Sequence, residues 1–448
     1  MSIIEISDLQ QRVAGEACEW SARIEGLPPG LGEDRLWFRF PAQYAPWLRS
    51  GAEPALAALL PIAMLLHRSL QAQGRASWRF LSGCGQIMTL YSSWDSRLRP
   101  VQIRVADGTS EGGAREAIGA FFTGGVDSFY TLLQNLERER GENRIRHVIF
   151  IRGYADCPLD ELRLCENLSA RLRQAAAVYG AELVVAETNL KAFTPPPGTS
   201  WDWYAGSQLA APGLCLERGF RRLHIPAGDT YATQAPWGSH PLVDPSWSTD
   251  GLEFRHDGCE AVRSQKLEWL VTHFPGVLAH LRVCGYDVSG VHNCGRCEKC
   301  LRTMIGLAAL GVAPPPGLFA TALDLDRVRQ LDGGDRVAGY YLQDNLRLLE
   351  TTGKAPEVEQ AVRYAMRSSG RRWLLRLLRN AAREVDRRYM GSRARGWALR
   401  QAGGDSASQA ELRLTPGKWV LRQAWQSARA GSGRKSGDGS ASAEREVG

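Results

Sequence analysis

The sequence lacks a hydrophobic segment long enough to cross a membrane. Its longest apolar run, residues 54–66, is shorter than the roughly 20 residues that a spanning helix needs, and it contains Pro61. The first 15 residues include Glu5 and Asp8, and they lack the basic stretch and apolar core of a secretory signal. We therefore expect no transmembrane segment and a cytoplasmic location.

The composition is that of a soluble globular protein. The chain has 448 residues, of which 44% are hydrophobic and 23% charged, and this length predicts roughly two or three domains. Residues 361–448 carry 19 Lys and Arg against 7 Asp and Glu, although the whole chain has a net charge of only +7. The body is therefore mildly acidic and the tail basic.

A run of apolar residues that ends in two glycines is the most informative stretch. Residues 118–122 read as a buried strand, and Gly124 and Gly125 separate it from a helix that includes residues 130–133. Backbone N–H groups at a helix start are free to bind an anion, and glycine allows close approach to phosphate oxygens. Ser128 can cap this helix or donate its hydroxyl to a phosphate. Asp127 suits the site if a divalent cation lies between it and the phosphate.

The string Thr123-Gly124-Gly125-Val126-Asp127-Ser128 resembles the SGGxDS signature of the PP-loop ATP pyrophosphatases. That family includes 7-cyano-7-deazaguanine synthases, GMP synthetase, asparagine synthetase and tRNA-thiolating enzymes. Thr123 replaces the usual serine and keeps a hydroxyl group. No Gly-Lys-Ser/Thr follows the glycines, which argues against a Walker-type loop. The alternative is an ordinary turn between a strand and a helix.

The residues after 116 alternate between strand and helix patterns, which predicts a parallel sheet with helices on both faces. Ligands bind such sheets beyond the carboxyl ends of the strands. Three turns lie at such ends: residues 124–125, residues 153–156, which include the candidate ligand-binding residue Asp156, and residues 228–229. Strands are expected at 118–122, 147–154, 182–187 and 222–227, and helices at 159–179, 207–218 and 264–273.

Residues 1–115 form a candidate N-terminal α+β extension, with strands at 36–40 and 99–105 and helices at 54–70 and 85–94. No catalytic motif occurs there, so a structural cap or an oligomerisation module is expected. The other expected domains are 116–312, 313–402 and 403–448.

Residues 228–257 read as a long loop, which in an α/β domain is often functional. Its tentative substrate-binding residues are Trp237, Ser239, His240, Asp244, His256 and Asp257. Lys266 follows at the start of a helix, where a cation is unusual on dipole grounds. Contact with a bound phosphate would explain Lys266, and a solvated lysine is the alternative.

Four of the ten cysteines form the pattern C-x9-C-x2-C-x2-C: Cys284, Cys294, Cys297 and Cys300. Thiolates at this spacing converge on one ion and complete a tetrahedron, which favours Zn²⁺. An iron–sulfur cluster remains open, and His292 is an alternative to Cys284. Without an export signal, a reduced compartment and a metal site are expected rather than disulfides.

The cluster and the glycine turn together resemble the 7-cyano-7-deazaguanine synthases of queuosine biosynthesis, over about 118–312. The resemblance implies a PP-loop (HUP-like) fold with a structural zinc site. It implies that residues 123–128 and Asp156 bind ATP and that Asp127 holds Mg²⁺. It also implies that the enzyme adenylates a carboxylate or amide acceptor. Asp127, Ser128 and Lys266 would be the catalytic residues. A sulfur-transfer enzyme acting on RNA and a non-catalytic nucleotide-binding protein are the alternatives.

The basic tail contains one amphipathic pattern, at residues 371–385, and a weaker one at 418–427. Such a helix can dock on the acidic body of its own chain, on anionic lipid or on nucleic acid. Residues 431–448 are rich in Gly and Ser, and we expect them to be disordered. A homo-oligomer is compatible with the sequence.

Overall fold

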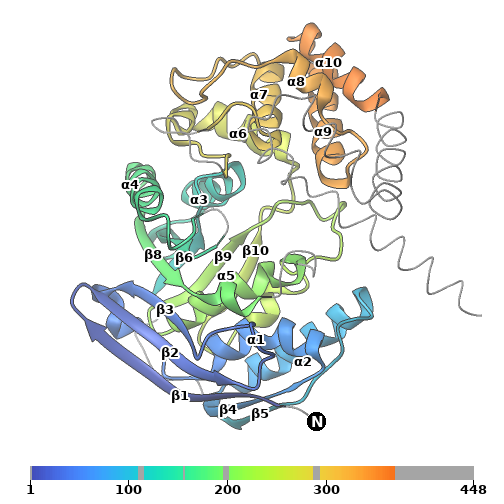
Figure 1. The fold of residues 1–448 in the computed structure, drawn as a ribbon. Helices are drawn as coiled ribbons and strands as arrows, with labels where there is room; N and C mark the ends of the chain where they lie inside the picture. The colour runs from blue at the N-terminus through green and yellow to red at the C-terminus, as the bar shows by residue number, and fades with distance from the viewer. Residues whose placement is uncertain (1–2, 109–115, 155–156, 195–200, 286–292, 369–448) are drawn as a thin grey trace, which may run out of the picture. The chain divides into compact units, whose positions relative to one another are not determined.

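A ten-stranded sheet runs through the computed structural model, which describes residues 3–108, 116–154, 157–194, 201–285 and 293–368 (Figure 1). The strand order is β10-β9-β6-β7-β8-β3-β2-β1-β4-β5. The strands are β1 (Ile3–Ala14), β2 (Ala17–Glu25), β3 (Arg35–Pro41), β4 (Ser69–Ala76), β5 (Ile103–Asp107), β6 (Ala117–Phe121), β7 (Ile145–Arg152), β8 (Glu182–Thr188), β9 (Phe220–Pro226) and β10 (Glu253–Asp257).

The five strands β10, β9, β6, β7 and β8 are parallel to one another. The chain runs from β6 outward through β7 to β8, and then returns to the other side of β6 with β9. The strand order therefore reverses between β6 and β9, where ligands bind in open α/β sheets. The predicted α/β class with a mostly parallel sheet is confirmed.

Side chains of these strands alternate between two apolar layers, as a strand that is buried on both faces requires. Phe121 and Ile149 pack with residues of α1, α2 and α5 on one face. Phe122 and Val148 pack with residues of α3, α4 and α6 on the other. The helices are α1 (Glu53–Leu66), α2 (Trp78–Trp94), α3 (Val126–Arg138), α4 (Leu162–Val178), α5 (Ala205–Cys215), α6 (Arg263–His273), α7 (Glu298–Leu310), α8 (Leu325–Gln330), α9 (Arg336–Thr352) and α10 (Pro356–Arg367).

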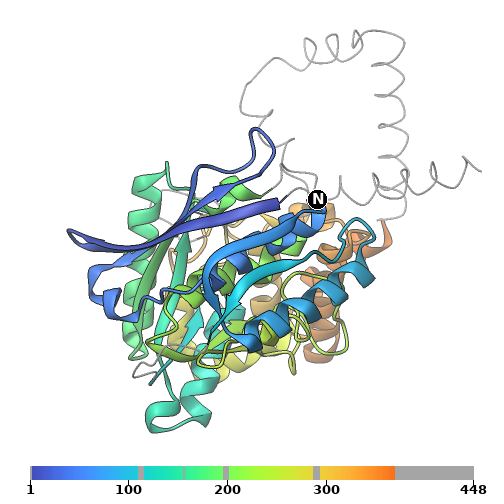
Figure 2. The ribbon, with the colours of Figure 1, turned by 90° about the horizontal axis from the view of Figure 1, so that it is seen from below.

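The predicted N-terminal extension contributes β1–β5 to this same sheet. Antiparallel β3 joins β8, and β2 and β1 continue the sheet beyond it (Figure 2). The helix predicted over 54–70 ends earlier, because His67 has a left-handed backbone (φ 55°) and residues 69–76 form β4. Strands β1, β2 and β4 were absent from the prediction, and the strand expected at 99–105 begins only at Ile103.

The segment predicted as a loop over 228–257 contains a short 3₁₀ helix, Asp244–Trp247, and the edge strand β10. After it, α7–α10 pack around a separate apolar cluster that includes Leu301, Ile305 and Val362. Asp156, His292 and the basic tail from residue 369 lie outside the described residues.

Cys157 and Cys165 form a disulfide with Cα atoms 5.6 Å apart. It joins the segment after β7 to the first turn of α4. This disulfide differs from our expectation from the sequence, which was a reduced compartment without disulfides.

A buried ion network ties the N-terminal strands to the parallel sheet. Arg49 lies before α1 and pairs with Glu53 (2.5 Å) and with Glu217, and at most 3% of each side chain is exposed. Glu217 also accepts a hydrogen bond from Thr249, which precedes β10 (2.6 Å). Burial raises the pKa of Glu53, and Arg49 partly offsets this by stabilising the charged carboxylate. The arginine therefore keeps two buried carboxylates compensated.

We predict that Arg49→Met lowers the free energy of unfolding by about 3–5 kcal/mol, because it leaves buried carboxylates without their cation. Urea denaturation followed by tryptophan fluorescence measures the change. Arg23→Met is the control, since Arg23 is half-exposed and lies 3.9 Å from Glu25; its effect should stay below about 1 kcal/mol. Equal effects of the two substitutions would contradict a stabilising role for the network.

Candidate functional site

The glycine turn lies directly after β6, at the point where the strand order reverses. Gly124 has a left-handed backbone (φ 73°), and Gly125 precedes the first residue of α3, Val126. A side-chain carbon at Gly124 would lie only 2.8 Å from Leu172 Cδ2. The turn therefore requires glycine at this position.

The start of α3 presents free backbone donors. Gly125 is the N-cap and provides no side-chain cap. The sequence suggested Ser128 as a possible cap of this helix, but Ser128 lies inside the helix and does not cap it. Its hydroxyl donates to the Gly125 carbonyl (3.0 Å). Thr123 is exposed next to this turn. The N–H groups of the first turn of α3 are therefore available to an anion.

Asp127 faces two cations from α6. Its carboxylate lies 2.5 Å from Arg263 Nη1 and 3.4 Å from Lys266 Nζ. Burial raises the pKa of Asp127, but Arg263, Lys266 and Arg302 lower it by a larger amount, so that the carboxylate is held ionised. Lys266 is 1% exposed and also donates to the Ala227 carbonyl at the end of β9 (2.7 Å). Lys266 is therefore a buried residue of this corner and not a solvated lysine.

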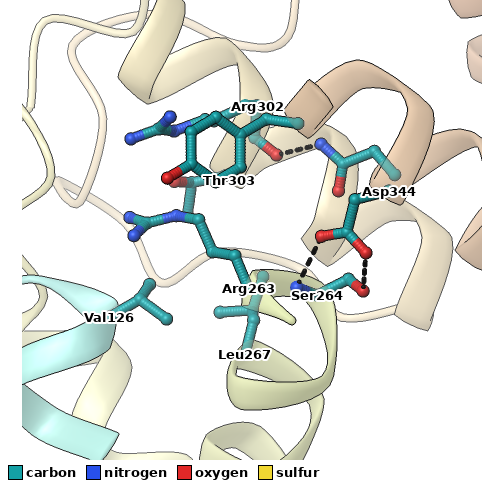
Figure 3. Close-up of a pocket in the computed structure, with 9 residues that line it drawn as sticks. Val126, Arg263, Ser264, Leu267, Arg302, Thr303 and Asp344 are labelled. Carbon is teal, nitrogen blue, oxygen red and sulfur yellow. Dashed lines mark hydrogen bonds between the residues drawn. The ribbon is translucent and has the colours of Figure 1, made fainter. Parts of the chain in front are cut away.

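Arg302 of α7 brings a second guanidinium group to Arg263. Figure 3 shows that both side chains extend to the same side of a pocket that Val126 also lines. The guanidinium of Arg302 stacks on the Tyr341 ring at 3.9 Å, and its Nε has no hydrogen-bond partner among the described residues. Burial and the neighbouring Arg263 lower the pKa of Arg302. An anion between the two groups would relieve this repulsion.

Asp344 of α9 holds the start of α6 in place. Its carboxylate accepts hydrogen bonds from the Ser264 N–H (2.9 Å) and from the Ser264 hydroxyl (2.6 Å), as Figure 3 shows. Asp344 thus caps the helix that supplies Arg263 and Lys266.

The structure brings three of the six predicted substrate residues together. Asp244 Oδ2 accepts from the Ser239 hydroxyl at 2.7 Å and lies 2.6 Å from His256 Nδ1. His240 adjoins this group, since its carbonyl accepts from the Asp244 N–H at 2.9 Å, and its ring packs against Trp94 with ring centroids 5.0 Å apart.

The other two predicted substrate residues have different surroundings. Trp237 is 40% exposed on the surface. Asp257 lies 3.7 Å from His224 Nδ1.

Sequence reasoning missed Arg263, Arg302 and Tyr341. Arg263 precedes Lys266 by one helical turn, so a search for basic pairs at helix starts would find it. Arg302 and Tyr341 reach the pocket only because α7 and α9 pack beside α6, and no local pattern shows this.

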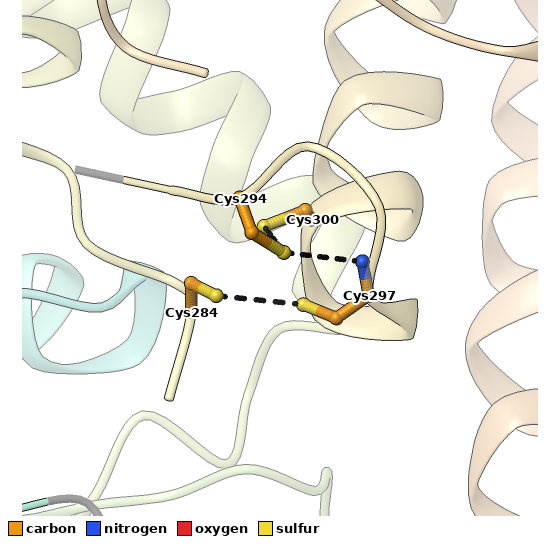
Figure 4. A group of neighbouring side chains, drawn as sticks. All are labelled: Cys284, Cys294, Cys297 and Cys300. Atoms are coloured by element: carbon orange, nitrogen blue, oxygen red, sulfur yellow. Dashed lines mark hydrogen bonds between the residues drawn. The ribbon is translucent and has the colours of Figure 1, made fainter. Parts of the chain in front are cut away.

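The four cysteines converge as predicted (Figure 4). All four sulfur atoms lie within 4.8 Å of one another, and the Cys284–Cys297 and Cys294–Cys300 pairs are 3.7 and 3.8 Å apart. A tetrahedron of sulfurs around zinc has edges of about 3.8 Å, given a Zn–S bond of about 2.3 Å. The group can therefore hold a metal ion, with all four positions supplied by protein.

Buried Asn293 connects the two segments that carry these cysteines. Its side-chain oxygen accepts from the backbone N–H groups of Val283 (2.7 Å) and Cys284 (3.1 Å). Its amide donates to the carbonyls of Leu281 and Leu318, each at 3.0 Å. Cys284 is thereby fixed next to Cys294.

The cysteine cluster and the glycine turn are directly connected. The backbone N–H of Arg282, two residues before Cys284, donates to the Gly124 carbonyl (2.7 Å). On the other side, the first two turns of α7 carry both Cys300 and Arg302. A metal ion bound to the cysteines would therefore fix the position of Arg302 relative to the turn.

Comparison with protein-family models, curated proteins and solved structures finds no match. Among the described residues, no helix combines the length and apolarity that a membrane span requires.

We predict that the protein binds one metal ion per chain and that Cys294→Ser loses it, because three thiolates leave the tetrahedron open. Elemental analysis of the purified full chain measures zinc and iron, and a thermal melt reports the accompanying loss of stability. The control is Cys84→Ser, since Cys84 is a buried cysteine of α2 outside the cluster. Retention of the metal by Cys294→Ser, or iron with labile sulfide in the wild type, would contradict a zinc tetrahedron.

Proposed function

We propose that the protein is an ATP-dependent synthetase that adenylates a carboxylate or amide acceptor and releases pyrophosphate and then AMP. One observation carries the proposal: the glycine turn opens beside three buried or nearly buried cations, Arg263, Lys266 and Arg302. Asp127 pairs with Arg263 and Lys266, and Glu298 lies 3.5 Å from Arg302, so that three cations face two carboxylates. This excess of positive charge suits an anionic ligand.

The pyrophosphate group would bind where α3 begins. The N–H groups of the first turn and the helix dipole favour negative charge there, and Gly124 lets the backbone approach closely. Thr123 is exposed at the same edge and offers its hydroxyl. Arg263 and Arg302 would neutralise the charge that develops on the leaving group.

Asp127 is suited to hold Mg²⁺ together with the phosphates. A carboxylate has about four lone-pair positions, and the pairs with Arg263 and Lys266 leave some of them free. Its carboxylate is 22% exposed, which leaves a path from solvent. Bound Mg²⁺ would supply charge neutralisation on the phosphate oxygens.

In the proposed reaction an acceptor oxygen attacks the α-phosphorus of ATP. The new P–O bond forms as the bond to the β-phosphate oxygen breaks, and pyrophosphate leaves with that electron pair. The acceptor is now an adenylate, and attack by ammonia or another nucleophile releases AMP. The protein residues hold the phosphates in line for the displacement and stabilise the leaving group, which is the main contribution that proteins make to phosphoryl transfer.

The segment after β9 offers surfaces for a planar acceptor. Tyr231 is 67% exposed and Trp237 is 40% exposed, so their rings are available for stacking. This supports a heteroaromatic acceptor of the kind that the 7-cyano-7-deazaguanine synthases use. The cysteine cluster would serve as a structural zinc site, because a closed tetrahedron has no open position for catalysis.

We predict that the full chain, given α-labelled ATP, Mg²⁺ and 7-carboxy-7-deazaguanine, produces labelled AMP and supports exchange of pyrophosphate into ATP. Asp127→Asn should lower both rates by about 100-fold or more, because it removes a charge that organises the phosphate site. Thin-layer separation of the labelled nucleotides measures both rates.

The matched control is Asp326→Asn, since Asp326 is an exposed carboxylate that pairs with Arg329 on the surface of α8. Its rates should equal those of the wild type. Production of ADP alone, or an Asp127→Asn variant as active as the wild type, would refute the proposal.

A further inference from the structure

Cys259 lies in a group of polar side chains at the end of β10 that the adenylation step does not use. The thiol is 1% exposed, two residues after the strand. His256, in the strand itself, interacts with this thiol and with the carboxylate of Asp244. Sulfur, imidazole and carboxylate thus follow one another in the order that activates a cysteine nucleophile.

The carboxylate orients the histidine. Asp244 is fully buried, and its Oδ2 lies 2.6 Å from His256 Nδ1 and accepts from the Ser239 hydroxyl at 2.7 Å. Burial lowers the pKa of His256, but Asp244 and Cys259 raise it by a larger amount, to about 9. A ring held in this way can accept a proton from the thiol and keep it next to the sulfur.

Gln234 supplies a donor at the same sulfur. Its amide Nε2 lies 3.3 Å from Cys259 Sγ and donates to it. When the sulfur carries an acyl group, an amide placed there is positioned to donate to the acyl oxygen. The other described free cysteines outside the metal cluster are buried: burial raises the pKa of Cys18 to about 11, and it also raises the pKa values of Cys84 and Cys215.

This group adjoins the proposed phosphate site. Gly258, the residue before Cys259, has a left-handed backbone (φ 92°), and a side-chain carbon there would lie 3.4 Å from Lys266 Nζ. Lys266 in turn pairs with Asp127. An acceptor activated at the α-phosphate would therefore form close to the segment that carries the thiol.

We propose that Cys259 receives the acyl group of the adenylate, so that the reaction passes through a thioester on the enzyme. This inference rests on the proposed function. The Cys259 sulfur attacks the acyl carbon, the C–S bond forms, and the bond from that carbon to the phosphate oxygen breaks to release AMP. The thiol proton passes to His256. An amine then attacks the thioester to give the amide and loses a proton to solvent, and the sulfur leaves as a thiolate that takes the stored proton back from His256. No oxidant or reductant is needed.

The first test traps the intermediate. The full chain is incubated with ATP, Mg²⁺ and 7-carboxy-7-deazaguanine without an amine and is then quenched in acid. Mass spectrometry of the peptides should find the acyl group on Cys259 in the wild type, and neutral hydroxylamine should remove it. An acyl group on no peptide, with AMP accumulating normally, would overturn the thioester.

The second test separates a chemical role of Cys259 from a structural one. Cys259→Ser keeps a group that can hydrogen-bond to Gln234 and His256, so a purely structural role predicts normal amide formation. The thioester predicts that Cys259→Ser retains pyrophosphate exchange but loses amide formation. His256→Gln should slow amide formation by about 100-fold or more. Cys215→Ser, a buried cysteine of α5, is the control and should behave as the wild type.

The outcomes separate the two proposals. Exchange with normal amide formation in Cys259→Ser would leave the synthetase in place and refute the thioester. Absence of exchange in the wild type would refute both.

A third test needs no acceptor substrate. Iodoacetamide should alkylate Cys259 of the folded wild type faster than the equally buried Cys84 and Cys215, and His256→Gln should slow this reaction selectively. Equal rates at the three cysteines would contradict an activated thiol.

Discussion

The contact of Asp127 with the cations of α6 is the interaction on which the rest of this site depends. A lysine that is 1% exposed is costly unless its charge is paired and hydrogen-bonded, and Lys266 obtains both from Asp127 and the Ala227 carbonyl. These three groups come from α6, α3 and the end of β9, so the pairing fixes two helices against the carboxyl edge of the sheet. The free N–H groups of α3 and the guanidinium of Arg263 then face the same corner.

The second constraint comes from α7, which carries one of the clustered cysteines and an arginine of the pocket in its first two turns. Cys300 and Arg302 are two residues apart, and Arg282 N–H joins the segment before Cys284 to the glycine turn. Metal binding organises a fold when its ligands come from separate segments. In the function that we propose, the cysteine cluster has no chemical role, and it acts by holding one cation of the phosphate site in register with the turn.

The parts of the fold that sequence reasoning predicted are those with a strong local signal. The glycine turn, the buried strand before it and the four converging cysteines each depend on neighbouring residues, and the structure places them as expected. Strands β1 and β4 were not predicted because polar residues at their exposed positions, such as Gln11 and Gln71, interrupt the apolar pattern of the buried face. The role of Arg302 in the pocket and the contact of Cys259 with His256 were not predicted. Both arise from tertiary packing, for which a single sequence carries no periodic signal.

The account is tested most directly by a crystal structure of the full chain with Mg²⁺ and a non-hydrolysable ATP analogue. It predicts density for the β- and γ-phosphates against the N–H groups of Gly125–Ser128, within hydrogen-bond distance of Arg263 and Arg302, and the metal ion at Asp127. An unchanged corner in which Arg263 and Lys266 still enclose Asp127, with the nucleotide absent or bound elsewhere, would contradict it.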